Sequence, residues 1–164
     1  MAARLAFPRL VGGPIRVEVR ASLGPHLAAT WIRRRLVRLD REVLLRAGEF
    51  ERILIHEIFH FVWVRLSNAE RRSWETVLAR ELRAGVAGEL GWSAEWRKAK
   101  LDRSDAASRS PRWRRYACES FCDSAAWLFS RIGRHGEFTL GGAARRIRAD
   151  WFRRKFPATR ALPI

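Results

Sequence analysis

Apolar and polar residues alternate near the N-terminus of the chain, which predicts a β-strand. From Pro14 to Arg20, the apolar residues Ile15, Val17 and Val19 alternate with charged ones, as expected for a strand with one face against a core. A second extended segment is expected at 35–39, although helical periodicity fits part of that region as well.

Apolar residues at helical spacing predict four longer helices after these strands. They cover residues 49–66, 69–83, 111–130 and 143–156. Trp92 and Trp96, four residues apart, indicate either a short basic helix or an irregular segment, and 104–111 is predicted as a loop. The predicted fold class is α+β and mostly helical.

The helix at 49–66 carries the most specific motif of the chain, His56-Glu57-Ile58-Phe59-His60. Residues four apart lie on one face of a helix, so both imidazoles can reach one metal ion. Zinc lowers the pKa of a bound water to about 7, and Glu57 can accept the proton. The alternative is a buried helix in which these side chains hydrogen-bond within the core, and without partners their burial would cost several kcal/mol. Zinc-dependent hydrolysis is the predicted chemistry.

A catalytic zinc ion usually takes three protein ligands, and Glu119 is the candidate for the third. Glu119 and Asp123 lie four residues apart on the helix predicted at 111–130. One can bind the metal, while the other accepts the free ring N–H of His56 or His60 and so orients that ligand. Solvent-exposed helix charge is the alternative for this pair.

With these two segments the chain resembles the gluzincins, the thermolysin-like zinc metallopeptidases, whose His-Glu-x-x-His helix is followed by a helix carrying Glu-x-x-x-Asp. The resemblance implies a zincin-like fold with a small mixed sheet packed on the motif helix. It also implies that His56, His60 and Glu119 bind Zn²⁺, that Glu57 is the general base, and that Asp123 supports a ligand.

The resemblance further implies an edge strand that pairs with an extended peptide substrate, and 35–39 is the candidate. Two features depart from the pattern. Cys118 stands where many gluzincins have asparagine, and the interval between the two motifs is longer than in compact members. A helical insertion at about 69–109 would explain the longer interval, within one domain spanning 1–164 that resembles the miniature members of the group.

Stabilisation of the transition state requires a hydrogen-bond donor near the developing oxyanion. Gluzincins often use a tyrosine or histidine downstream of the motif, and Tyr116 and His135 are the candidates here. Tyr116 precedes Glu119 by one helical turn, and His135 lies in a glycine-flanked loop. An ordinary surface role is the alternative for both, and His26 beside Gly24-Pro25 offers less and is not a candidate.

The 164 residues carry a net charge of +16, mostly from arginine, which favours an acidic partner such as nucleic acid or an anionic surface. Solvated helix faces are the alternative. A second function class is therefore a basic nucleic-acid or anionic-surface binding module on an inactive zincin fold, with tryptophans that stack on bases.

The remaining features concern location and the cysteines. Arg52 and Arg65 bracket the most apolar run, so no membrane span is expected, and a cytoplasmic location is the default because the N-terminus lacks a signal-peptide apolar region. Cys118 and Cys122 are expected to be reduced, packed thiols. The C-terminal residues 156–164 are either a frayed terminus or a tail that closes the cleft.

Overall fold

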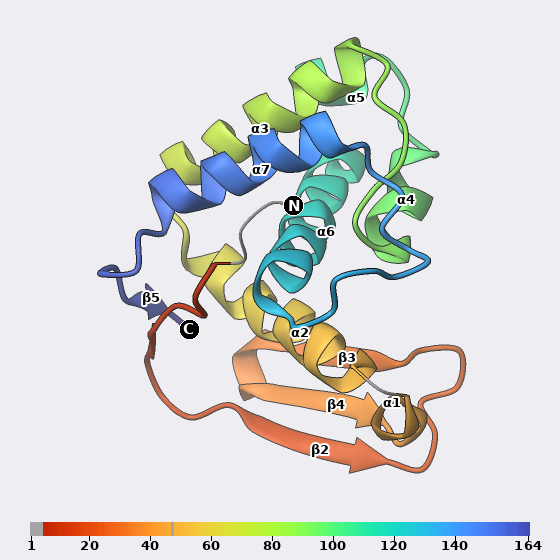
Figure 1. Cartoon of the computed structure of the whole chain (residues 1–164), viewed down its shortest axis with the longest axis vertical. Coiled ribbons are helices and arrows are strands. Elements are labelled where there is room, and N and C mark those ends of the chain that lie inside the picture. The colour runs from red at the N-terminus through yellow and green to blue at the C-terminus, as the bar shows by residue number, and fades with distance from the viewer. Residues whose placement is uncertain (1–4, 47) are drawn as a thin grey trace.

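Three strands form a small mixed sheet beneath a long helix (Figure 1). In the computed structural model, which describes residues 5–46 and 48–164, β2 (Arg16–Arg20) pairs in parallel with β4 (Leu36–Asp40). β3 (Ala28–Trp31) pairs with β4 in the antiparallel sense on the other side, and the turn Ile32–Arg34 joins these two strands. The two predicted strands are confirmed, whereas β3 was not expected.

β4 is the central strand of this sheet, so the expectation that 35–39 forms the substrate-facing edge is wrong. β3 takes the edge position because it doubles back beside β4. The burial expected for β2 is also wrong, since Val17 and Val19 are 43% and 46% exposed. The helix above the sheet covers Val37 and Leu39 of β4. It does not cover Val17 and Val19, their partners on β2, which remain exposed to solvent.

Within residues 5–46 and 48–164, seven helices complete the mixed α+β fold, and about 53% of the described residues are helical. They are α1 (Glu42–Leu45), α2 (Glu49–Arg65), α3 (Asn68–Arg83), α4 (Trp92–Lys98), α5 (Asp105–Ser108), α6 (Pro111–Phe129) and α7 (Gly142–Lys155). The four longer helices match their predicted ranges within one or two residues. Their ends are locally encoded: Ser67 and Glu70 form a capping box at α3, and Ser110 accepts from the Trp113 N–H at α6. None of the helices in the described ranges could cross a membrane.

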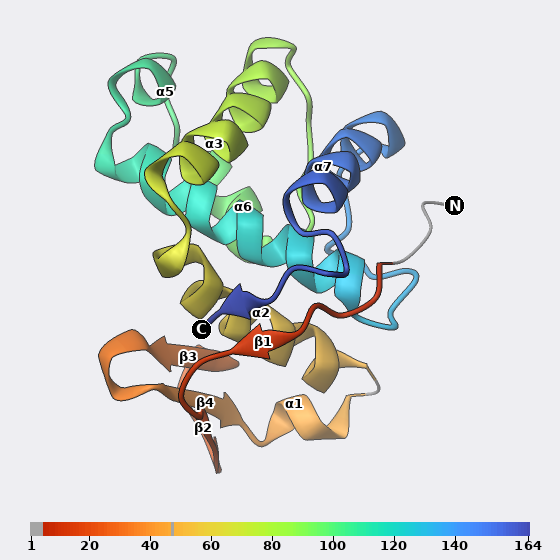
Figure 2. The same cartoon turned by 90° about the vertical axis from the view of Figure 1, so that its left-hand side faces the viewer.

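The helices stack in layers above the sheet, with α2 lowest, then α6, then α3 and α7 side by side (Figure 2). Aromatic side chains join these layers. Phe121 of α6 lies at the centre, with ring centroids 5.2 Å from Phe152, 5.9 Å from Phe59 and 6.0 Å from Trp74. All four are fully buried, so this contact fixes α2 and α6 against each other.

A buried ionic network ties the 69–109 segment to the rest of the helices. Arg148 of α7 is fully buried and lies 2.6 Å from Glu81 and 2.7 Å from Glu89. Tyr116 donates to Glu89 as well. Burial opposes ionisation of Glu89, but Arg148 outweighs it and lowers the pKa of that carboxyl. The segment contains α3, α4 and α5, and its origin as an insertion in a single domain stays a prediction.

Two short strands, one from each terminal region of the described chain, lie side by side next to α2 (Figure 2). β1 (Leu10–Val11) pairs in parallel with β5 (Leu162–Pro163), and Leu162 is buried. Arg35 donates to the carbonyl of Ile164 at 2.9 Å. These contacts hold the C-terminal residues in a defined place.

Candidate metal centre

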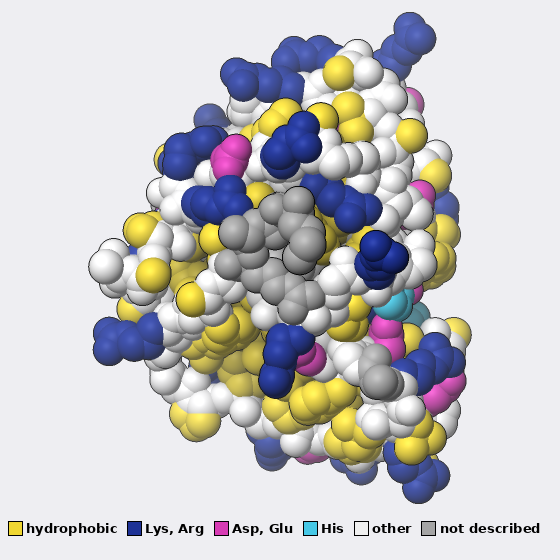
Figure 3. All heavy atoms as spheres, viewed as in Figure 1, with side chains coloured by type: hydrophobic (Ala, Val, Ile, Leu, Met, Phe, Trp, Pro, Cys, Tyr) yellow, Lys and Arg dark blue, Asp and Glu magenta, His cyan; other side chains and the backbone are white. Residues whose placement is uncertain are grey.

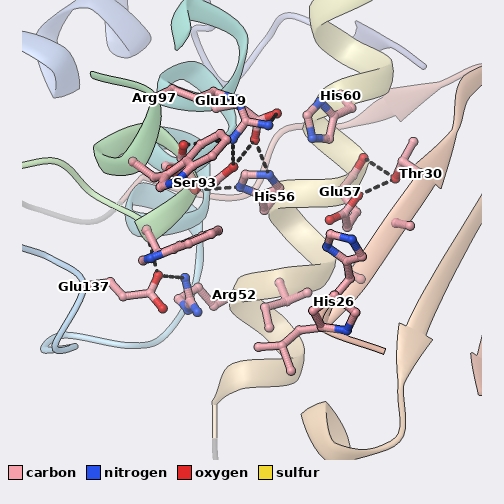
Figure 4. Close-up of a pocket in the computed structure, with 18 of the residues that line it drawn as sticks. His26, Thr30, Arg52, His56, Glu57, His60, Ser93, Arg97, Glu119 and Glu137 are labelled. Carbon is pink, nitrogen blue, oxygen red and sulfur yellow. Dashed lines mark hydrogen bonds and ion pairs between the residues drawn. The ribbon is translucent and has the colours of Figure 1, made fainter. Parts of the chain in front are cut away.

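The predicted site residues line a cleft of about 820 Å³ between the sheet edge and the helices. α2 runs along its floor and contributes His56, Glu57 and His60, with β3 on one side and α4 on the other (Figure 4). Figure 3 shows imidazole atoms in a hollow at the right-hand edge, between the helical layers and the sheet. The C-terminal residues do not line this cleft, so the expectation of a cleft-closing tail is wrong: pairing with β1 holds them elsewhere.

His56 is held between two carboxylates of α6. Its Nδ1 lies 2.7 Å from Asp123 Oδ1, and its Nε2 lies 3.3 Å from Glu119 Oε2. Burial opposes protonation, but Asp123 outweighs it and the pKa of His56 is raised well above its usual value. Two ligands about 2.05 Å from a tetrahedral zinc ion lie about 3.3 Å apart, so this nitrogen and oxygen fit one metal ion. A zinc ion would replace the proton there.

Glu119 points into the cleft toward His56 rather than to solvent (Figure 4). Ser93 of α4 donates to its Oε2 at 2.7 Å, and Arg97 lies 3.4 Å from its Oε1. Burial raises the pKa of this carboxyl, but the hydrogen bond and charge of His56 outweigh it and set the pKa at about 2. Glu119 is therefore an ionised ligand candidate whose orientation is fixed by α4.

His60 has a different environment from His56. Its Nδ1 faces two thiols, 3.5 Å from Cys118 and 3.6 Å from Cys122. The hydrogen bond from Cys122 lowers the pKa of Cys118 to about 6, whereas burial raises that of Cys122 well above its usual value. Neither cysteine lines the cleft.

Two ligand sets are therefore available around the histidines. Atoms of His56, His60 and Cys122 lie within 4.8 Å of one another, the one such cluster of three or more found in the described residues, and it does not include Glu119. Cys122 is fully buried, so a metal ion held there would lie inside the protein. Glu119 lines the cleft together with both histidines, so a metal ion held there could keep a position open to water.

Glu57 is anchored by the edge strand. Thr30 of β3 donates to its Oε2 at 2.6 Å, and the Glu57 side chain lines the cleft on the β3 side, turned toward Thr30 (Figure 4). This contact places a potential proton acceptor beside the strand that would hold a substrate.

Both carboxylate oxygens of Asp123 have hydrogen-bond partners. Its Oδ1 contacts His56, and its Oδ2 accepts from the Ala94 N–H at 3.1 Å. A Cβ added at Gly91 would lie 2.3 Å from the Asp123 carboxylate carbon, so only glycine allows the α3–α4 segment to approach so closely. The backbone conformation does not require glycine here, since any residue can adopt its φ of −176°. The requirement comes from the lack of space for a side chain.

Gly91→Ala should therefore weaken metal binding without touching a ligand. The added methyl group displaces Asp123 and releases His56, and loss of such a supporting carboxylate typically costs 10- to 100-fold in metal affinity, so about that range is expected. Competition with a chromogenic chelator measures the affinity. Gly141→Ala serves as the control for glycine replacement, since its φ of −67° suits alanine and its added Cβ meets nothing within 4 Å. An unchanged zinc affinity in Gly91→Ala would remove Asp123 from the centre.

The two residues expected to stabilise the oxyanion do not line the cleft. Tyr116 is 1% exposed and donates to Glu89 in the buried ionic network, because its position on α6 faces α7 rather than α2. His135 Nε2 lies 2.5 Å from Glu49 at the start of α2. Both assignments are corrected by these placements.

Several cleft residues were missed by sequence reasoning. His26 lines the cleft beside Glu57, although its place beside Gly24-Pro25 did not make it a candidate. Thr30 lies on an unpredicted strand, and the pattern around it contains no signal of its role. The spacing of Trp92 and Trp96 was visible, but their position in the cleft depends on how α4 packs on α6.

Comparisons of the chain with protein families, curated proteins and solved structures found no match. The residues of the centre define its chemistry. These provide two imidazoles one turn apart, a carboxylate 3.3 Å from one of them, and a further carboxylate on the cleft floor.

Proposed function

We propose that the chain is a zincin-like zinc metallopeptidase in which His56, His60 and Glu119 hold the metal. The observation that carries this proposal is the 3.3 Å separation of His56 Nε2 and Glu119 Oε2 in a cleft also lined by His60 and Glu57. The match of this separation to tetrahedral zinc ligands supports it. The gluzincin assignment rests on the same residues.

Zinc bound there would act as a Lewis acid toward a peptide carbonyl and lower the pKa of water. Glu57 accepts the proton of the attacking water and later gives it to the leaving amine nitrogen. Thr30 holds the carboxylate of Glu57 on the β3 side of the cleft, and Asp123 fixes the tautomer of His56. His26 replaces Tyr116 and His135 as the candidate donor to the oxyanion.

The substrate would lie as an extended peptide along β3. This strand pairs with β4 on one side only, and its other edge borders the cleft. Free N–H and C=O groups at a sheet edge bind extended chains by adding a strand. Such pairing would place the scissile carbonyl near Glu57, which Thr30 ties to the same strand.

A second candidate is a structural metal site on a protein without peptidase activity. The His56, His60 and Cys122 cluster favours it, because a buried thiolate would exclude the open position needed for catalysis. The acidic partner and cytoplasmic location suggested by composition can accompany either function.

Metal analysis combined with peptide cleavage tests the proposal. The purified protein should contain one zinc ion per chain and cleave a mixed peptide library, and a chelator should stop the cleavage. Glu119→Gln should lower metal content, while Cys122→Ser should retain it. Metal lost from Cys122→Ser but kept by Glu119→Gln would establish the structural site and reject the peptidase.

A further inference from the structure

Two tryptophans on α4 lie exposed at the rim of the cleft. Trp92 is 62% exposed and Trp96 is 45% exposed, although both side chains line the cleft. Their rings stack with centroids 6.0 Å apart and an interplanar angle of 23°. An exposed aromatic pair within a cleft is an unsatisfied apolar surface that a ligand can cover.

Cations cover part of this pair. Lys100 Nζ lies 3.3 Å from the centroid of the Trp96 ring, and the Arg97 guanidinium lies 5.4 Å from it. Trp92 has Trp96 as its aromatic neighbour, and it remains the more exposed ring. The Trp92 ring is therefore the face available to an incoming group.

The pair is also held rigidly beside the candidate metal centre. The Trp92 N–H donates to Glu137 at 3.0 Å, Ser93 donates to Glu119, and the Ala94 N–H donates to Asp123. Three consecutive residues of α4 thus fix the position of the rings relative to His56. A side chain that stacks on Trp92 would belong to a residue close to the cleaved bond.

We propose that Trp92 and Trp96 form the recognition site for a large aromatic side chain of the peptide substrate, next to the bond that is cleaved. This inference rests on the proposed function, because it takes the occupant of the cleft to be a peptide paired with β3. α4, which carries both rings, lies across α2 from that strand (Figure 4), so a peptide on the strand would direct alternate side chains toward the α4 side of the cleft.

The charges around the rings favour a peptide over a nucleic acid. Four carboxylates line the cleft, those of Glu57, Glu119, Asp123 and Glu137, against the two guanidinium groups of Arg52 and Arg97. Arg97 pairs with Glu119, and Arg52 pairs with Glu137, which also accepts from the Trp92 backbone N–H. Carboxylates in a cleft repel a phosphate backbone, even on a chain with a net charge of +16. An uncharged aromatic side chain meets no such repulsion.

Peptide binding to the Glu57→Gln protein tests this inference without turnover. Fluorescein-labelled octa-alanine peptides, each with one phenylalanine moved along the sequence, are titrated with zinc-loaded protein and followed by anisotropy. At one or two positions, phenylalanine should tighten binding about tenfold over the all-alanine peptide, which is the range of one aromatic contact. Trp92→Ala and, separately, Trp96→Ala should remove this gain, and Trp92→Phe should restore part of it.

Phe50→Ala is the matched control, since this 40% exposed aromatic of α2 does not line the cleft, and it should keep the full preference. Wild-type protein stripped of metal by a chelator gives the same measurement if Glu57→Gln does not fold. No binding, equal binding of all peptides, or a preference that survives both tryptophan variants overturns the inference. Tryptophan-dependent binding of oligothymidylate in place of peptide also overturns it.

The two proposals can fail separately. Cleavage of peptides without any preference for an aromatic residue would overturn the recognition site and leave the peptidase standing. A Trp92-dependent aromatic preference in a protein that cleaves no peptide would reject the peptidase and retain peptide recognition.

Discussion

Glu57→Gln is expected to abolish peptide hydrolysis while the protein keeps its zinc. Glutamine has nearly the same shape, and its amide oxygen can still accept the Thr30 hydroxyl that now contacts Glu57 Oε2 at 2.6 Å. It cannot accept a proton from water at neutral pH. Loss of a general base typically lowers the rate by 10²- to 10⁴-fold, so kcat should fall by about that factor.

Metal content and peptide cleavage are measured on the same preparation of this variant. Glu51→Gln is the matched control, because Glu51 lies on the same helix, pairs with Arg131 and does not line the cleft. It should retain full activity. Cleavage at the wild-type rate by Glu57→Gln would end the assignment of Glu57 as the base, whatever the metal content.

Arg148→Met is expected to have the largest effect on stability. Methionine fills much of the buried volume but removes the counter-charge of Glu81 and Glu89, which are 4% and 0% exposed. Lys98 remains 3.4 Å from Glu89, so Glu81 loses more of its compensating positive charge than Glu89 does. Breaking a buried ion pair from one side costs about 3–5 kcal/mol, which corresponds to a decrease in Tm of about 10 °C for a chain of this size.

Urea unfolding of the wild type and the variant measures this loss. Arg146→Met on the exposed face of the same helix is the control and should change the free energy of unfolding by less than about 0.5 kcal/mol. Adding Glu81→Gln and Glu89→Gln to Arg148→Met should recover part of the loss, since no buried charge is then left unpaired. A stable single variant would show that the network contributes little.

The pH dependence of this loss follows from the lowered pKa of Glu89. In the wild type, the ionised carboxylate contributes stability above its unfolded pKa of about 4.5, and the contribution is lost as pH falls through the lower folded pKa. In the variant the Glu89 carboxylate is buried without the charge of Arg148, and protonation of Glu89 removes the cost of that buried charge. The difference in unfolding free energy should therefore be largest near pH 7 and shrink below about pH 4.5.

Most of the helices can be predicted from the local sequence. Periodic apolar residues, the capping box of Ser67 and Glu70, and Pro111 at the start of α6 are signals within one or two turns of each helix. The spacing of His56 and His60 also follows from helix geometry alone. Glu119 was a ligand candidate because zinc needs a third ligand and because of its spacing to Asp123, and the structure places its side chain 3.3 Å from His56.

Other features depend on contacts between residues far apart in the chain. β3 has no strong alternation, and its edge position exists only because β4 pairs with β2 on the other side. Tyr116 and His135 were misplaced for a similar reason, since the direction of each side chain depends on Glu89 and Glu49, which come from other elements.

The motif helix, its two histidines and Glu57 are thus encoded by short-range periodicity, because an α-helix repeats every 3.6 residues whatever surrounds it. The cleft is a property of tertiary packing. Its strand wall, its α4 wall with Trp92, and the close approach of Gly91 to Asp123 join segments separated by tens of residues. Such contacts cannot be predicted from a local sequence pattern. They depend on how the buried surfaces of distant segments pack together when the whole chain folds.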